Sequence, residues 1–341
     1  MAVTMHPFAM AHAGDASGVA AALRDVPGGA GLVLVAKVPG PASLNDPSRE
    51  LAQIVFRDAL GGAPCRMILS VGCEGIASAG GILLADDGVA HPGGPERLAM
   101  GSAESSVIPA AARGLAAHSE AVATAVRAAI QAAGLVPGEV RLVLVKSPVR
   151  RDQDNATGRA RGAAALGVAL ALGEVGAVGD AILADPVLYS ARAMTMSGTE
   201  VDRAEVVVLG NRAGAGGALT VGSAVLRDLL DIGGLRAMLR GLGLCFDMDG
   251  VLISAPGAGA AFPFVLLKAG LAGDGAIRGR AIHAIGTDMP PDKHLRAAAS
   301  GVLASVLGQV GGFVTGGAEH QGPPGACIAA AIAPAVDHVA R

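Results

Sequence analysis

Three lysines, each at the end of an apolar segment, are the first residues that point to chemistry. The segments are GLVLVAK, VRLVLVK and FPFVLLK, which end at Lys37, Lys146 and Lys268. A buried lysine loses its proton easily, and a neutral lysine can deprotonate a hydroxyl for attack on a carbonyl carbon. Each lysine is followed by an arginine in a predicted helix and then by a hydroxyl residue shortly before a glutamate: Arg49 and Ser70, Arg161 and Ser197, Arg296 and Thr315.

This order recurs three times in one chain. The lysines are 109 and 122 residues apart, so we expect three similar units, over residues 1–95, 99–214 and 220–341. Three copies of one unit can close around a pseudo-threefold axis and present their basic and hydroxyl groups to one central cavity. Such an electropositive cavity suits a small, flat ring that carries several carbonyl groups.

Short β-branched segments alternate with longer alanine-rich ones, which predicts an α/β fold. We expect strands over 31–37, 65–70, 140–146, 204–209, 262–268 and 312–315. We expect helices over 49–60, 110–133, 159–173, 217–242 and 292–307. These elements place each lysine at the end of a buried strand.

Composition excludes several other classes of protein. The chain has 341 residues, 52% hydrophobic residues, 2% aromatic residues and a formal net charge of −3, so it offers neither stacking platforms nor a positive field for nucleic acid. No apolar stretch reaches the length of a membrane span. The four cysteines form no CxxC pair and no signal peptide is evident, so we expect a cytoplasmic protein whose partner is a small heterocyclic substrate.

Four segments resemble the ring-opening amidohydrolases, the family of cyanuric acid hydrolase and barbiturase. They are KVPGPASLNDPSR (37–49), ARGAAALGVALALGE (160–174), SGTEVDRAEVVVLGN (197–211) and TGGAEHQGPPG (315–325). The resemblance implies three similar α/β units around a pseudo-threefold axis with the substrate on that axis. It also implies a homotetramer and hydrolysis of a cyclic amide through an acyl-enzyme.

The resemblance implies a role for each repeated residue. Lys146 would be the base and Ser197 the nucleophile, while Lys37 and Lys268 would support their own hydroxyl partners. The groups around the ring would be Arg49, Arg161, Arg296, Ser70, Val71, Gly198, Thr315 and Gly316. No cofactor would be required for the chemistry.

The chain departs from the family pattern at its first and third hydroxyl motifs. Val71 stands where the family has glycine, and Thr315 where it has serine, which would fit a ring less symmetric than cyanuric acid. We expect a substrate of the cyanuric acid type, with a barbiturate or a related cyclic imide as the alternative. A structural magnesium or calcium ion would be held by backbone carbonyls of Ala318, Gln321, Gly322, Pro323 and Ala326. A family glutamate near the third lysine is replaced, since Ala269 and Gly270 follow Lys268.

Two other functions stay open. A heterocycle-binding protein without catalysis would fit the altered motifs. The segment CFDMDGVL (245–252) matches the first motif of haloacid dehalogenase-like phosphatases, in which Asp247 would attack phosphorus and Asp249 would be the acid/base; a turn is the alternative interpretation. His294 and His320 form no metal-binding motif, and we expect them at the surface or in loops.

Overall fold

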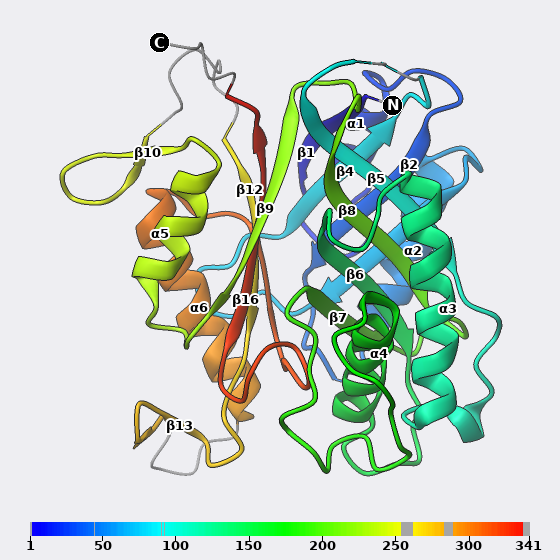
Figure 1. The fold of residues 1–341 in the computed structure, drawn as a ribbon, viewed down its shortest axis with the longest axis vertical. Coiled ribbons are helices and arrows are strands. Elements are labelled where there is room, and N and C mark those ends of the chain that lie inside the picture. The colour runs from blue at the N-terminus through cyan, green and yellow to red at the C-terminus, as the bar shows by residue number, and fades with distance from the viewer. Residues whose placement is uncertain are drawn as a thin grey trace.

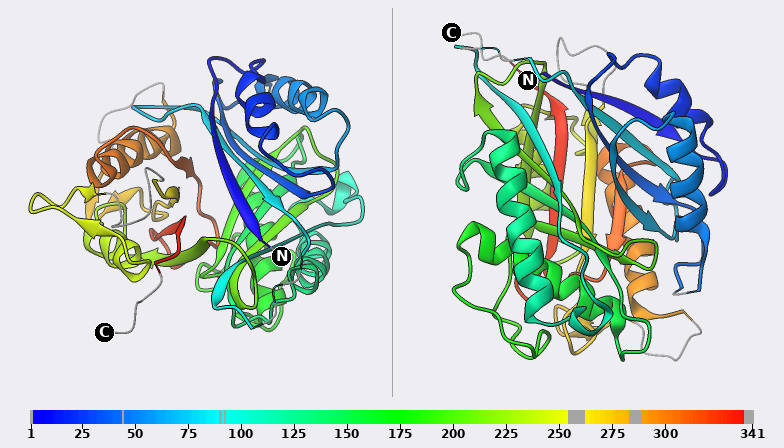
Figure 2. Two further views of the ribbon diagram at one scale, coloured as in Figure 1. Left: turned by 90° about the horizontal axis from the view of Figure 1, so that it is seen from above. Right: turned by 90° about the vertical axis from the view of Figure 1, so that its right-hand side faces the viewer.

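The computed structural model describes residues 2–43, 45–89, 91, 93–253, 262–282 and 289–336. It contains three four-stranded sheets, each built from one continuous stretch of chain and each carrying helices on its outer side (Figure 1). Viewed from above, the three sheets surround a common centre (Figure 2). We call the three parts units A, B and C.

The elements follow one order in all three units. Unit A contains β1 (Val3–Ala9), α1 (Ser17–Leu23), β2 (Gly31–Val38), α2 (Ser48–Ala59), β3 (Cys65–Val71) and β4 (Gly80–Asp86). Unit B contains β5 (Glu96–Glu104), a 3-10 turn η1 (Ala110–Ala112), α3 (Ala116–Ala133), β6 (Val140–Pro148), α4 (Ala156–Leu172), β7 (Ala193–Gly198) and β8 (Glu205–Ala213). Unit C contains β9 (Leu219–Leu226), α5 (Ile232–Gly241), β12 (Phe264–Ala269), α6 (Pro291–Leu307), β15 (Phe313–Gly316) and β16 (Cys327–Pro334), with the short hairpins β10 (Cys245–Phe246)–β11 (Leu252–Ile253) and β13 (Ala276–Ile277)–β14 (Arg280–Ala281) inserted. None of these helices is long and apolar enough to cross a membrane.

The three sheets share one topology. Their strand orders are β1-β4-β2-β3, β5-β8-β6-β7 and β9-β16-β12-β15. In each sheet the second strand of the unit runs parallel to the third and antiparallel to the last. The prediction of three similar α/β units around a pseudo-threefold axis is therefore confirmed.

Each sheet is buried on both faces. Alternate residues of a strand point to opposite sides, so each strand contributes to two cores. In β2, Leu32 and Leu34 pack beneath α1 and α2 in the core of unit A. Val33 and Val35 instead join a central core that all three sheets share. The outer faces of units B and C pack on their own helices in the same way. The parity of a residue along its strand thus decides whether it faces the axis or the helices.

One expected helix is wrong. Residues 217–242 do not form a single helix: Leu219–Leu226 is strand β9, paired along its whole length with β16, and only Ile232–Gly241 is helical. The reason is tertiary, since β9 completes the third sheet and finds its partner more than a hundred residues away.

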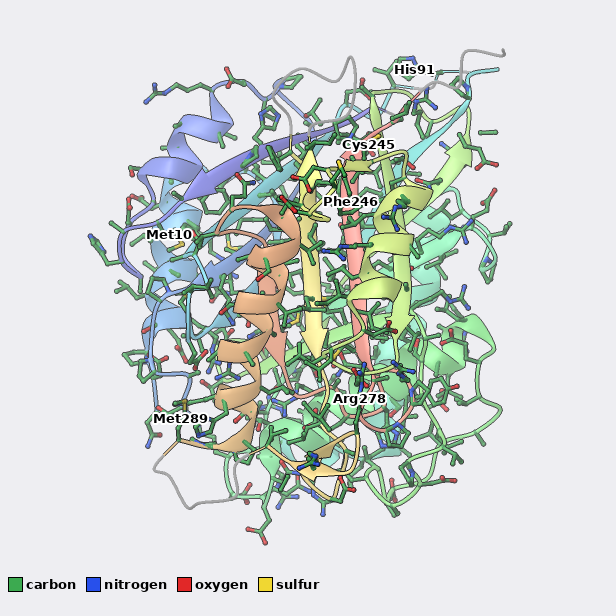
Figure 3. All side chains as sticks on the ribbon, turned by 90° about the vertical axis from the view of Figure 1, so that its left-hand side faces the viewer. Met10, His91, Cys245, Phe246, Arg278 and Met289 are labelled. Atoms are coloured by element: carbon green, nitrogen blue, oxygen red, sulfur yellow. The ribbon has the colours of Figure 1, made fainter. Side chains whose placement is uncertain are left out.

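The segment with phosphatase-like spacing is a hairpin. Strands β10 and β11 pair antiparallel, and the Asp247 carboxylate accepts a hydrogen bond from the backbone amide of Val251 at 2.8 Å. Asp247 and Asp249 are both exposed. Figure 3 shows Cys245 and Phe246 at the opposite end of unit C from Met289, which borders a cavity described below. The turn interpretation holds, and neither aspartate lines either of the two cavities described below.

Candidate active site

The three repeated lysines all face the axis. In β2, Val33 and Val35 belong to the central core, so Lys37 points the same way. The same parity puts Lys146 of β6 and Lys268 of β12 on the inner face of their sheets, and all three side chains are at most 1% exposed. A fourth lysine, Lys293, is the only other one in the sequence. Three of the four lysines of this chain are therefore buried in the interior.

Strand parity gives a different result for the hydroxyl residues. Ile68 and Phe313 belong to the central core, so Ser70 of β3 and Thr315 of β15 face the axis. In β7, Met194 and Met196 belong to that core. Parallel pairing sets Ser70 beside Lys37, Thr315 beside Lys268 and Met196 beside Lys146. The axial position of unit B is thus occupied by a methionine.

Ser197 points away from the axis, toward helix α4. Its hydroxyl donates to the backbone carbonyl of Thr157 at 3.2 Å. Its register partner Ser147 also faces the helices, because the Nε2–H of His118 on α3 donates to it at 2.6 Å. No hydrogen bond among the described residues joins Ser197 to Lys146. The expected Lys146–Ser197 pair is therefore not formed, since the two side chains leave opposite faces of one sheet.

Lys146 and Lys268 each reach a strand of the preceding unit. Lys146 Nζ donates to the Leu69 carbonyl at 3.0 Å and lies 2.5 Å from the Glu200 carboxylate. Lys268 Nζ donates to the Thr195 carbonyl at 2.6 Å. These contacts tie units A, B and C together at the axis.

Lys37 contacts a hydroxyl instead. Its Nζ lies 3.3 Å from Ser70 Oγ and 3.3 Å from the Val71 carbonyl oxygen. Ser70 Oγ in turn lies 3.3 Å from Thr315 Oγ1, so hydroxyls of units A and C meet. Of the lysines in the described ranges, Lys37 alone is hydrogen-bonded to a hydroxyl group.

Burial lowers the pKa of each of these lysines. Desolvation, aided by the nearby Arg296 guanidinium, lowers the pKa of Lys37 to about 7. Desolvation also lowers the pKa of Lys268 well below its ordinary value, with Arg161 acting in the same direction. For Lys146, burial lowers the pKa but the Glu200 carboxylate opposes that shift. Lys37 is consequently able to act as a base near neutral pH, whereas Lys146 lies in direct contact with the Glu200 carboxylate.

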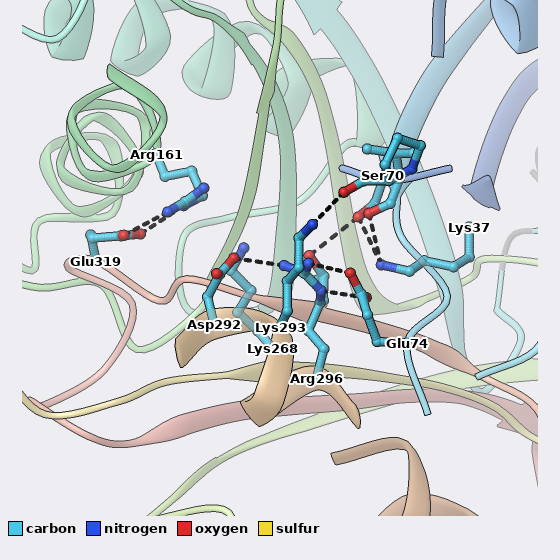
Figure 4. Close-up of polar contacts among 12 residues, drawn as sticks. Lys37, Ser70, Glu74, Arg161, Lys268, Asp292, Lys293, Arg296 and Glu319 are labelled. Atoms are coloured by element: carbon cyan, nitrogen blue, oxygen red, sulfur yellow. Dashed lines mark hydrogen bonds and ion pairs between the residues drawn. The ribbon is translucent and has the colours of Figure 1, made fainter. Parts of the chain in front are cut away.

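The arginines form a ring of ion pairs from unit to unit. Arg161 of unit B pairs bidentately with Glu319 of unit C, at 2.6 and 2.7 Å. Arg296 of unit C pairs with Glu74 of unit A, at 2.6 and 2.8 Å (Figure 4). The third pair joins Arg49 of unit A to Glu200 of unit B at 3.1 Å. Each guanidinium has five N–H donors, so each keeps donors for a ligand.

The three glutamates were not assigned a role from the sequence, although a signal was present. Each ends one of the hydroxyl-containing turns. Ser70 and Thr315 lie four residues before their glutamates, but Ser197 lies three before Glu200. Counting back four from Glu200 gives Met196, in agreement with the strand register.

The two expected glycines pack against charged groups. A Cβ atom added to Gly198 would lie 2.0 Å from the Glu200 carboxylate and 2.6 Å from Lys146 Nζ. A Cβ atom on Gly316 would lie 3.0 Å from the Arg296 side chain. Glycine at 198 is therefore required for the Lys146–Glu200 contact.

Two cavities open at the carboxyl ends of the inner strands, between neighbouring units. One, of about 530 Å³, lies between units B and C and is lined by Arg161, Gly317 and Glu319 among others. The other, of about 620 Å³, lies between units A and C and is lined by Gly40, Glu74 and Lys293 among others. Both volumes are ample for a small ring. The three repeated lysines and the axial hydroxyls of Ser70 and Thr315 are not among the residues that line these two cavities.

The expected metal loop does not offer a ready set of ligands. The carbonyls of Ala318 and Pro323 already accept backbone hydrogen bonds, and none of the five expected residues carries a carboxylate, the donor that magnesium and calcium favour. A Cβ atom on Gly270 would lie 2.0 Å from the Ala326 carbonyl oxygen, so this loop packs directly against the backbone at Gly270. The metal site stays a prediction, and no step below uses one.

His320 corrects one expectation. It lies in a loop, as expected, but it is buried, and its two ring nitrogens lie 2.5 Å from the carbonyl oxygens of Ile182 and Leu188. The histidine fastens a loop of unit B to the glutamate turn of unit C.

Comparison with known proteins agrees with this architecture. The profile of the family described as amidohydrolase ring-opening protein matches residues 4–334. The chain is 36% identical to a cyclic amide hydrolase of Azorhizobium caulinodans, covering 97% of this chain and 99% of that protein. It is 37% identical to a cyanuric acid amidohydrolase of Methylobacterium sp., covering 95% of each, and 30% identical to barbiturase 1 of Nocardioides sp., covering 88% of this chain and 90% of that protein.

A solved structure is similar over nearly the whole chain. The crystal structure of cyanuric acid hydrolase from A. caulinodans superposes with a TM-score of 0.86 at 34% identity, covering 98% of this chain and 99% of that one. The chain belongs to the family of ring-opening amidohydrolases. It is an amidohydrolase that acts on C–N bonds of cyclic amides.

Proposed function

We propose that this enzyme opens a small nitrogen ring with several carbonyl groups, of the cyanuric acid type, by attack of a side-chain hydroxyl that a lysine deprotonates. One observation carries the proposal: three buried lysines from equivalent strands face one axis, together with the hydroxyls of Ser70 and Thr315. A group of cations and hydroxyl donors in a closed interior is suited to a ring whose carbonyl oxygens gain negative charge during attack.

The reaction balances as a hydrolysis in two halves. A neutral lysine takes the hydroxyl proton as the oxygen bonds to a ring carbonyl carbon, the ring C–N bond breaks, and the lysine returns the proton to the leaving nitrogen. The opened ring remains attached as an acyl ester. Water then gives a proton to the lysine and adds to the ester carbon. The ester C–O bond breaks, and the side-chain oxygen takes that proton from the lysine and becomes a free hydroxyl again. The sum is one ring and one water converted to one ring-opened acid.

Two rings are the principal candidates. Cyanuric acid presents three equivalent carbonyls separated by ring nitrogens, whereas barbituric acid keeps three carbonyls and replaces one nitrogen by CH2. The first and third hydroxyl positions of this chain differ, as Ser70 and Thr315, and the second is Met196. This inequality of the three units supports a ring that is less symmetric than cyanuric acid.

The test is hydrolysis of each ring by the purified protein, followed as loss of ring absorbance and as appearance of the ring-opened acid by mass spectrometry. We expect turnover of at least one ring. Failure to hydrolyse either ring would contradict the proposed function. A rise in the melting temperature with a ring that is not hydrolysed would instead favour the second candidate, a heterocycle-binding protein, for which the absence of a Lys146–Ser197 contact is the supporting observation.

The expected homotetramer and the cytoplasmic location stay predictions. Size-exclusion chromatography with light scattering of the purified protein measures the oligomeric state.

A further inference from the structure

We propose that the nucleophile is Ser70 of unit A, with Lys37 as its base, and that Met196 receives an apolar edge of the ring. This inference rests on the proposed function and assigns its reacting groups. It differs from the assignment that family resemblance implies, in which Ser197 and Lys146 of unit B react.

Geometry separates the candidate pairs. Lys37 Nζ lies within hydrogen-bonding distance of Ser70 Oγ, 3.3 Å away. Because this hydroxyl can rotate, it can donate to the amine when Lys37 is neutral. Lys146 contacts a carbonyl and a carboxylate, and Ser197 contacts a carbonyl of α4. A base must reach the proton that it removes, and only the pair in unit A meets this condition.

The charged groups around the two lysines also favour Lys37 as the base. Five charged or titratable groups act on Lys37: Arg296, Lys268, Cys73, Glu74 and Asp292. The two carboxylates among them are both bound to Arg296. Lys146, by contrast, lies 2.5 Å from Glu200, which no arginine holds in two hydrogen bonds. An ammonium in direct contact with a carboxylate keeps its proton, so Lys146 is the weaker base.

Access favours unit A as well. The cavity between units A and C is lined by Cys73 and Glu74, in the turn directly after Ser70. Close to that turn, the hydroxyls of Ser70 and Thr315 lie 3.3 Å apart. Thr315 can donate to a carbonyl oxygen of the ring, but no lysine bonds to it, so it is a binding group rather than the nucleophile.

Met196 then defines the far side of the ring. It is 3% exposed and occupies the axial position that is a hydroxyl in the other two units. A thioether offers no hydrogen to a carbonyl oxygen, so a carbonyl buried against it would lose its hydrogen bond to water. The ring class that fits is a cyclic imide or ureide with CH, CH2 or an alkyl group at that edge.

The experiment measures turnover of barbituric acid and cyanuric acid by the full-length protein and by matched serine-to-alanine variants. Ser70→Ala is expected to lower kcat/KM at least 1,000-fold, and Ser197→Ala less than tenfold. Ser119→Ala is the control. Ser119 is a buried serine of α3 whose hydroxyl, like that of Ser197, donates to a carbonyl of helix α4, and it has no role in the proposed reaction. Melting temperatures of all variants show that each is folded.

A covalent readout excludes a merely structural role for Ser70. Ring opening expels no atom, so an acid-quenched reaction leaves an adduct with the whole mass of the ring. Tryptic cleavage puts Ser70 in the peptide 67–97 and Ser197 in the peptide 193–203, and we expect the adduct on 67–97. An adduct on 193–203, or loss of turnover in Ser197→Ala but not in Ser70→Ala, overturns the inference while the proposed function stands. A wild-type protein that hydrolyses neither ring overturns the proposed function itself.

Discussion

Met196 is the register partner of Lys146, in the place that Ser70 holds beside Lys37. Three units with one topology therefore present unequal groups to their shared axis. Unit A presents a lysine in contact with a hydroxyl, unit B a lysine in contact with a carboxylate, and unit C a lysine in contact with a carbonyl. The fold is threefold but the chemistry is not.

Replacing Met196 by serine is expected to change ring preference. The new hydroxyl would donate to a third ring carbonyl, so the ratio of kcat/KM for cyanuric acid to that for barbituric acid should rise by about 10-fold or more, since one satisfied hydrogen bond is worth about 1–2 kcal/mol. Steady-state kinetics on both rings measures the ratio. Met196→Leu is the control, because it keeps the volume without adding a donor. An unchanged ratio in Met196→Ser would show that no ring carbonyl approaches this position.

The pH dependence of turnover should report Lys37. Burial and Arg296 lower the pKa of Lys37 to about 7, and the base must be neutral to accept the serine proton. We expect kcat/KM to rise with pH through about 7 and then to level off. Lys37→Arg, which keeps a cation that cannot deprotonate, should remove turnover across the whole range. A profile that is flat between pH 5.5 and 9 would contradict the role of Lys37 as base.

Lys37 should also destabilise the folded protein, in a pH-dependent way. Its folded pKa of about 7 lies below the unfolded value of 10.5, so the unfolded chain binds more protons between these values and stability rises with pH. Lys37→Met is therefore expected to raise the free energy of unfolding by roughly 2–4 kcal/mol at pH 6 and by less than about 1 kcal/mol at pH 10. Urea unfolding at both pH values measures this. A stabilisation that does not shrink at pH 10 would be inconsistent with a depressed pKa.

The ion pair between units B and C should weaken in acid. Although burial works in the other direction, Arg161 holds the pKa of Glu319 down at about 2, against an ordinary 4.5. A carboxylate of this kind stabilises the fold above pH 4.5, and the stabilisation is lost as the pH falls to about 2. Glu319→Gln should lower the free energy of unfolding by roughly 2–3 kcal/mol at pH 7, and the gap to the wild type should close near pH 2.5.

The control for this prediction is the exposed pair Arg150–Asp152, whose aspartate side chain is 73% exposed. Asp152→Asn should leave the unfolding curve unchanged at pH 7 and at pH 2.5, since exposed ion pairs contribute little to stability. Equal effects of the two substitutions would mean that the Arg161–Glu319 contact does not bind units B and C together.

The sequence by itself determined the strands that carry the lysines and the direction in which those lysines point. In VLVAK and its two counterparts, alternation along a buried strand places the lysine on the same face as the residues two and four before it. The repetition of the lysine, arginine and hydroxyl order was also visible, and the three-unit fold follows from it. Strands β1, β4, β5, β9 and β16 were not predicted, because each is fixed by its pairing with a distant strand rather than by its own pattern.

Only the tertiary structure decided which groups meet. Whether Ser197 or Met196 faces the axis depends on a single step of strand parity, and one step turns a side chain to the opposite face. The pairing of each arginine with a glutamate of the next unit joins residues that are far apart in the sequence, 158 positions for Arg161–Glu319 and 222 positions for Arg296–Glu74. Contacts of that range arise when three sheets close around one axis, and no local spacing encodes them.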